Sequence, residues 1–325
     1  MQPSELMMGE VRTQLLQNST EIDSETSAQV LAFRADERPR ISVRPIRYAC
    51  SPELLSGIDC PLRTSSGTKT RGVGTAQARA VINGGRILQS SSYTSIPEGS
   101  VERRGPWSSY LARPGVIELI GRRADPADLV TGFLSADHAN DFLDLGAISD
   151  RLMDRVQGSK SLDRHPPFKI SRSRLRWVAE TTDGTPEAHF VLVSDTVRAL
   201  HLKCPRETSR GIVAVCEDLA YHDWLLSSLV LLSSKVLMGA APPAELGKLL
   251  APPIHHLLHL WMPAAHIDRT LLWPWEALEE SPGFTRQWQS SVDRMRDKVS
   301  INILSLLSGG PHDPDKGSSH GARRD

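Results

Sequence analysis

Residues 211–238 read GIVAVCEDLAYHDWLLSSLVLLSSKVLM, the longest stretch of the chain that requires a packed core for stability. Its apolar residues recur at the spacing of one helical face, namely at Ile212, Val215, Cys216, Leu219, Leu226, Leu229 and Val230. Gly239, followed by Pro242 and Pro243, ends this pattern. The second half is apolar nearly all round, so we expect one buried helix with other elements around it.

The composition is that of a globular protein without a dominant charge. The chain has 325 residues, 39% of them hydrophobic, and a formal net charge of zero. This length allows one large core or two moderate ones. A neutral chain has no global field that would attract nucleic acid or an anionic membrane, so we expect neither as a partner.

The cysteines and the N-terminal residues indicate the compartment. The four cysteines, at Cys50, Cys60, Cys204 and Cys216, form no CxxC pair, which gives no sign of a zinc or redox motif. We expect reduced, mostly buried thiols and no cofactor. The first residues lack a basic region followed by an unbroken apolar stretch, and no segment has eighteen apolar residues in a row. A cytoplasmic location is therefore the expectation.

The N-terminal two thirds of the chain predict strands. Small residues alternate with larger ones from Gly74 to Ile82, and Asn83-Gly84 then turns the chain into RILQSSSYTSI, which predicts a β-hairpin with one closely packed face. Residues 172–202 predict two or three antiparallel strands, with Asp183-Gly184 at the first turn. Pro52 at a first helical position predicts a short helix over residues 52–57.

The C-terminal third predicts helices. After the central helix come candidates at 244–262, interrupted by Pro252-Pro253, at 273–278 and at 284–307. The fold class expected is α+β, a strand-rich N-terminal region with antiparallel hairpins followed by a C-terminal helical bundle. We expect a strand-rich domain over residues 1–208, a helical domain over 209–308 and a disordered tail over 309–325.

Histidines suggest one candidate metal site. His255 and His259 are four residues apart and would share a helical face, as two metal ligands require. A third ligand is open among His222, Asp218 and Asp268. The competing interpretation, which we favour, is that the imidazoles line an amphipathic helix and bind no metal.

A second candidate lies on the central helix. Asp218 and His222 are also four apart, and a carboxylate–imidazole pair can orient a general base. No serine stands in a GxSxG turn, and Cys216 lies on the apolar face. We therefore expect no catalytic residue here, but a polar network that holds the helix against the strand region.

Two further motifs concern binding. Arg172, Arg174 and Arg176 alternate along a strand and share one face, which could contact phosphates but is more typical of an ion-pairing surface. Trp273 and Trp275 lie in a proline-punctuated segment, where large aromatic residues often contact a partner. The expectation is that at least one of these tryptophans is substantially exposed and binds a protein.

Several blocks resemble a known set of proteins: RPIRYACSPELLSGIDC, YLARPGVIELIG, CEDLAYHDWLL, HHLLHLWMPAAHIDRTLLWPWEALE and PGFTRQWQSSVDRMRD. They resemble an uncharacterised actinobacterial family of about 300 residues, encoded beside other uncharacterised proteins that include a P-loop-like one. The resemblance implies a component of a multi-protein system and a protein partner, possibly that P-loop-like protein. It implies no activity and leaves the oligomeric state open.

Nucleic-acid binding would require Arg172, Arg174 and Arg176 to join other basic residues in one patch, and two other functions are favoured over it. The first is a non-catalytic interaction or regulatory subunit of a multi-protein bacterial system. The alternative is a metal-dependent or hydrolase-like enzyme that uses the His255/His259 pair together with Asp218/His222. Convergence of these four side chains in one pocket would favour the enzyme.

Overall fold

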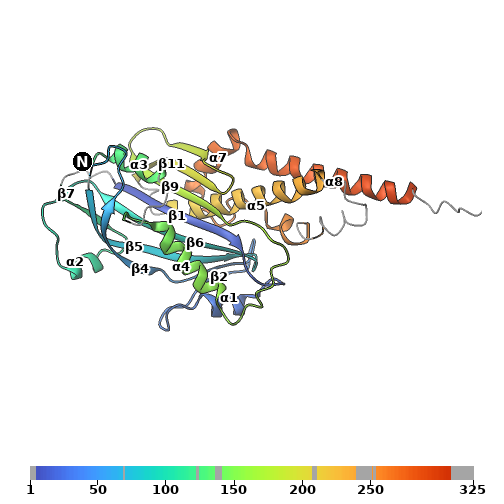
Figure 1. The fold of residues 1–325 in the computed structure, drawn as a ribbon, viewed down its shortest axis with the longest axis horizontal. Helices are drawn as coiled ribbons and strands as arrows, with labels where there is room; N and C mark the ends of the chain where they lie inside the picture. Colours follow the sequence, from blue (N-terminus) through green and yellow to red (C-terminus); the bar gives the residue numbers. More distant parts are fainter. Residues whose placement is uncertain are drawn as a thin grey trace, which may run out of the picture.

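The structure is a computed structural model that describes residues 5–68, 70–121, 124–135, 141–206, 211–238, 251 and 254–308. Within these ranges the chain forms an eleven-stranded, mainly antiparallel sheet with helices on both faces (Figure 1). The strands precede the main helices along the chain, so the α+β expectation is confirmed. The predicted disordered tail and most of residues 244–253 lie outside the described residues.

The middle of the sheet is built from long strands. β1 (Glu5–Leu15) pairs with β6 (Ile87–Pro97) on one side and with β9 (Ser173–Thr182) on the other. β5 (Thr70–Asn83) pairs with β6, which confirms the predicted hairpin. Gly84 and Gly85 turn the hairpin with φ angles of 61° and 65°, a region that glycine enters without steric cost.

Shorter strands complete the sheet. They are β2 (Arg40–Ser42), β3 (Tyr48–Cys50), β4 (Leu54–Leu62), β7 (Ser100–Val101), β8 (Ile117–Ile120), β10 (Glu187–Leu192) and β11 (Val197–Pro205). The helix expected over residues 52–57 is wrong, because β4 begins at Leu54 and pairs with β5 over its whole length. That ladder provides more backbone hydrogen bonds than a single helical turn supplies.

The last three strands differ from the expected hairpin order. β11 pairs in parallel with β9 and antiparallel with β10, so it lies between them, and Asp183-Gly184 does not join neighbouring strands. The physical reason lies in the alternation of β11, whose Leu200, Leu202 and Cys204 are buried on one face. A strand with such a face gains more in the interior position than the more exposed β10 would.

One face of the sheet packs against α4 (Leu145–Gln157), with α1 (Ser24–Leu31) and α3 (Pro126–Leu134) beside it. α4 crosses β6, β1 and β5 (Figure 1). Small residues allow this close approach: Ser149 and Ser92 are hydrogen-bonded through their hydroxyls at 2.9 Å, and Ala78 and Ala80 lie in the same buried cluster. The closely packed small-residue face that the sequence predicts is this one. A short helix, α2 (Trp107–Leu111), contacts β5.

The opposite face packs against α5 (Ile212–Met238), α7 (Trp273–Glu280) and α8 (Phe284–Ser308), with 3-10 turns η2 (Leu258–Leu260) and η3 (Arg269–Leu271) between α5 and α7. The first half of α5 is buried as predicted, with Trp224 and Leu225 almost fully enclosed. Strand and helix side chains share this core. The change from strands to helices falls where the sequence places it, while a division into two separate domains stays a prediction.

The second half of α5 differs from the expectation of burial all round. α5 and α8 run past the edge of the sheet (Figure 1), and Val230 and Leu231 on α5 are 47% and 41% exposed. On α8 the predicted apolar stripe is buried at Trp288 and Met295 but exposed at Ile303. None of the described helices has both the length and the hydrophobicity needed to cross a membrane.

Candidate functional site

Four polar residues on the first half of α5 form a polar centre between this helix and the sheet: Glu217, Asp218, His222 and Asp223. Glu217 accepts two hydrogen bonds from the guanidinium of Arg79 on β5, at 2.8 and 2.7 Å. The Ser91 hydroxyl also donates to the Glu217 carboxylate, and the Gln89 side-chain amide donates to the Glu217 backbone oxygen. Burial lowers the pKa of Arg79, but the Glu217 carboxylate outweighs that effect and raises it above its ordinary value.

Asp223 makes the second connection from α5 to the sheet. Its carboxylate accepts a hydrogen bond of 3.1 Å from Nε of Arg198 on β11, and both side chains are buried. Burial raises the pKa of Asp223, and Arg198 opposes that rise. A polar network between this helix and the sheet is present as the sequence predicts, but Glu217 and Asp223 make its contacts to β5 and β11, and not the Asp218 and His222 pair.

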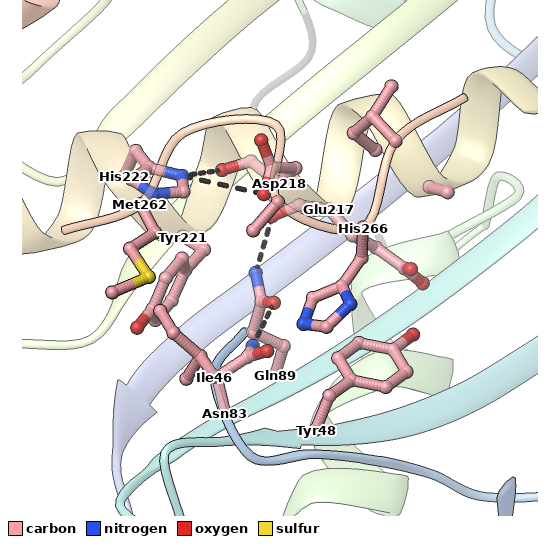
Figure 2. Close-up of a pocket in the computed structure, with 13 residues that line it drawn as sticks. Ile46, Tyr48, Asn83, Gln89, Glu217, Asp218, Tyr221, His222, Met262 and His266 are labelled. Atoms are coloured by element: carbon pink, nitrogen blue, oxygen red, sulfur yellow. Dashed lines mark hydrogen bonds and ion pairs between the residues drawn. The ribbon is translucent and has the colours of Figure 1, made fainter. Parts of the chain in front are cut away.

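The structure brings Asp218 and His222 together (Figure 2). Nδ1 of His222 lies 2.8 Å from the backbone oxygen of Asp218 and 3.6 Å from its Oδ1. Oδ2 of Asp218 accepts hydrogen bonds from Nε1 of Trp275, at 2.7 Å, and from the backbone of Ala264, at 2.9 Å. The Asp218 carboxylate thus holds two parts of the chain against α5: the segment between η2 and η3, through Ala264, and α7, through Trp275.

His222 is enclosed by aromatic rings. Tyr221, Trp261 and Trp275 present their rings at centroid distances of 4.7, 5.0 and 5.2 Å, roughly perpendicular to the imidazole. Burial lowers the pKa of His222, while Asp218 and the backbone of Met262 oppose the shift. The imidazole is consequently neutral at pH 7, because desolvation disfavours its charged form.

A small cavity adjoins Asp218 and His222. Its volume of about 40 Å³ admits water but not an organic substrate. Glu217, Tyr48 and His266 also line it (Figure 2). No serine, threonine or cysteine is among the described lining residues, and the hydroxyl of Tyr221, which also lines the cavity, donates to the backbone oxygen of Leu260.

A larger hollow of about 590 Å³ lies on the other side of Tyr48, whose ring packs against His266 at 4.8 Å. Arg79, Glu53 and Tyr93 line it, and the Tyr93 hydroxyl donates to Glu53 at 2.5 Å. Burial raises the pKa of Tyr93 above its ordinary value. Glu53 thus contacts both the Tyr93 hydroxyl and, at 3.8 Å, the Arg79 guanidinium, and the three side chains form one polar network in the wall of the hollow.

The histidine cluster lies apart from this centre. Nε2 of His259 is 3.3 Å from Glu21, and its side chain is half exposed; His255 is exposed. His259 lines a different hollow from the cavity beside His222. Among the described residues, no three His, Cys, Asp or Glu side chains group as a metal ion requires. The four residues of the enzyme alternative therefore do not converge.

The tryptophans of α7 differ from expectation. Trp275 is only 4% exposed, because its indole donates to Asp218 and packs against Phe284 of α8 at a centroid distance of 5.9 Å. Trp273 is partly buried against the same core. The prediction that at least one is substantially exposed is therefore wrong, and their contact with a partner stays a prediction that nothing here favours.

Arg174 and Arg176 of β9, with Arg172 just before the strand, form an ion-pair cluster with β1 and α4. Arg174 and Arg176 lie 3.4 and 3.3 Å from Glu10, and Arg12 lies 2.9 Å from the same carboxylate. Arg172 pairs with Asp150 of α4, which Arg12 also contacts at 3.2 Å. The ion-pairing interpretation of this row is the one that the contacts support.

Beside this cluster one part of the sheet is uncovered. Residues of β11 alternate between buried and partly exposed along the whole strand, which is the pattern of a strand whose two sides are unequally covered. We call the outward side chains of β10 and β11, with Val193, the open face: Glu187, His189, Val191, Val193, Val197, Ala199, His201 and Lys203.

Comparison of the chain with models of protein families, with curated proteins and with solved structures finds no match in any of the three. The residues that sequence reasoning missed are Arg79 and Arg198, the partners of the α5 acids. Their signal in the sequence is weak, because a single arginine within a strand pattern does not indicate which distant carboxylate it meets.

Proposed function

We propose that this chain is a non-catalytic interaction or regulatory subunit of a multi-protein bacterial system, and that a protein partner covers the open face. The observation that carries the proposal is the apolar half of that face. Val191 and Val193 are 54% and 57% exposed and stand beside the partly exposed Val197 and Ala199. Contiguous exposed aliphatic side chains on a sheet mark an interaction site.

The polar centre supports the same function. Glu217, Asp218 and Asp223 are each bonded to side-chain or backbone donors of another element, so they stiffen the molecule. A rigid sheet presents a binding face at a low cost in conformational entropy. The enzyme alternative receives less support, because His255 and His259 lie apart from Asp218 and His222.

The test compares two valines of similar exposure. Val191→Asp places a charge on the open face, whereas Val43→Asp places one at a distant site that is 65% exposed. The full chain is co-expressed with the P-loop-like protein expected to be encoded nearby, and the complex is measured by size-exclusion chromatography. We expect Val191→Asp to abolish the complex and Val43→Asp to leave it, with similar melting temperatures.

Two results would contradict this proposal. One is a complex that survives Val191→Asp, which would move the partner to another surface. The other is a chain that turns over a substrate with Asp218 and His222 intact and loses that activity on His222→Gln. If no complex with the P-loop-like protein forms, that protein is not the partner. Photo-crosslinking at Val191 in native cells then tests whether any other protein covers the open face.

A further inference from the structure

The open face ends at the arginine cluster, and the strand register fixes which residues meet there. Val197 of β11 stands opposite Arg174 of β9, and Arg174 stands opposite Arg12 of β1. At the next outward-facing position, Val191 of β10 stands opposite Ala199 of β11, and Ala199 stands opposite Arg176 of β9. The apolar half of the open face is therefore bordered by guanidinium groups along its β9 side.

These guanidiniums outnumber the carboxylates available to them. Glu10 is shared among Arg12, Arg174 and Arg176, and it is almost fully buried. Asp150 is shared between Arg12 and Arg172, and Asp154 lies 3.6 Å from Arg172. Among the described residues, four guanidiniums therefore face three carboxylates, so this part of the cluster carries excess positive charge.

Within this cluster, the charge of Arg174 is poorly compensated. Its Nε is buried and makes no hydrogen bond of normal geometry among the described residues, although Glu10 lies 3.4 Å away. Burial, together with the charges of Arg12 and Arg176, lowers the pKa of Arg174 below its ordinary value. A guanidinium in that position gains from an additional carboxylate.

The space beside it fits a helix. α4 packs on β1, β5 and β6, whereas the outward side chains of the adjoining β11 and β10 are partly or fully exposed within the described part of the chain. Strands lie about 4.8 Å apart, so the width from β9 to β10 is about 10 Å. One helix with its side chains is about 10 Å across. A helix beside α4 would complete the layer.

We infer that the partner covers the open face with an amphipathic helix whose apolar side packs on Val191, Val197 and Ala199, and whose acidic edge places a carboxylate against Arg174. This inference rests on the proposed function and specifies the chemistry of its partner. The other end of the face, where Lys203 pairs with Glu187 at 2.9 Å and His201 pairs with Glu180, supplies a polar rim.

A protein helix accounts for the face better than nucleic acid does. Phosphates would meet the arginines, but the adjoining residues are aliphatic, and the imidazoles of the open face, His189 and His201, lie beside the carboxylates of Glu187 and Glu180, which repel phosphate. A second copy of this chain would bring its own arginines, not a free carboxylate, to the same place. Both remain outcomes of the test.

The experiment uses the full chain in its native cells, with a photoreactive benzophenone amino acid at Val191. The cross-linked segment is identified by mass spectrometry, synthesised as a labelled peptide and titrated with the purified chain. We expect a segment with a helical apolar stripe and Asp or Glu along one edge. Arg174→Gln should weaken its binding about tenfold, and added salt should weaken the wild type more than this variant.

The matched control is Arg151→Gln, because Arg151 is an exposed arginine of α4. It should leave the binding unchanged. A cross-linked segment without acidic residues, or binding that is insensitive to Arg174→Gln, overturns the inference and leaves the proposed function intact. A cross-link to this chain itself or to nucleic acid overturns the inference by naming another occupant. Absence of any cross-link at Val191 contradicts the proposed function as well.

Discussion

The guanidinium of Arg79 and the carboxylate of Glu217 face each other between β5 and α5, joined by two hydrogen bonds although 138 residues separate them in the chain. Both side chains are buried, so neither charge has water as a substitute partner. This pair is the main polar connection between the sheet and its longest helix. Its removal is the most direct test of how the two parts are held together.

Glu217→Gln should destabilise the protein strongly. The substitution breaks a buried ion pair and leaves the Arg79 guanidinium with only the more distant and partly exposed Glu53 carboxylate, 3.8 Å away, and the loss of a buried partner costs about 3–5 kcal/mol in comparable cases. Urea unfolding measures the change in the free energy of unfolding. Arg34→Ala serves as the control, because the Arg34–Glu37 pair is exposed and its loss should change stability by less than about 1 kcal/mol. Equal effects of the two variants would show that the buried pair has no special weight.

Trp275→Ala should lower stability by about 3–5 kcal/mol, since it removes a buried ring and leaves Asp218 without its indole donor. Trp107→Ala removes a ring of the same kind at a site that is 39% exposed, so its effect should be much smaller. The melting temperatures of the two variants, compared with that of the wild type, test this difference. If the Trp275→Ala protein melts within a few degrees of the wild type, Trp275 is not needed for stability and becomes a candidate partner contact again.

Gly9→Ala should destabilise the protein by about 1–3 kcal/mol through overpacking. A Cβ atom at position 9 would lie 2.4 Å from the Trp177 ring, which is fully enclosed between β1 and α5 and has no room to move. At Gly57 the nearest atom would be 3.4 Å away, an ordinary contact, and Gly57→Ala is the matched control. Chemical denaturation of the two variants should separate them clearly.

Stability should fall as the pH drops below the ordinary imidazole pKa of 6.5. Burial lowers the pKa of His222 in the folded protein, so the unfolded chain takes up more protons in this range and the free energy of unfolding decreases. The contribution is complete above that pH and is lost below it. His222→Gln should therefore show a shallower slope between about pH 5 and about pH 7 than the wild type.

Other groups titrate near this range and require a control. The pKa of His256 is also lowered by burial, but less of that ring is enclosed, so His256→Gln should change the slope less. Asp223, whose pKa burial raises, acts in the opposite direction and is common to both variants. An unchanged slope in His222→Gln would mean that the pKa of His222 is the same in the folded and the unfolded protein, so that burial does not shift it.

Local sequence patterns predicted many of the helices and strands correctly. The helix at 212–238, the hairpin around Asn83-Gly84 and the final helix from Phe284 follow from periodicity and turn chemistry, which act between residues close in sequence. The position of acids on the first half of α5 also predicted a polar network between helix and sheet. These features need no knowledge of the distant partner.

Only the tertiary structure decided what depends on distant pairing. β11 lies between β9 and β10 because the buried face of a strand, and not its order in the chain, selects its neighbour. Trp275 is buried because Asp218, 57 residues away, accepts its indole hydrogen. The open face likewise exists because α4 lies over β1 and β6 and leaves the outward side of β11 uncovered, a choice of packing that no local pattern encodes.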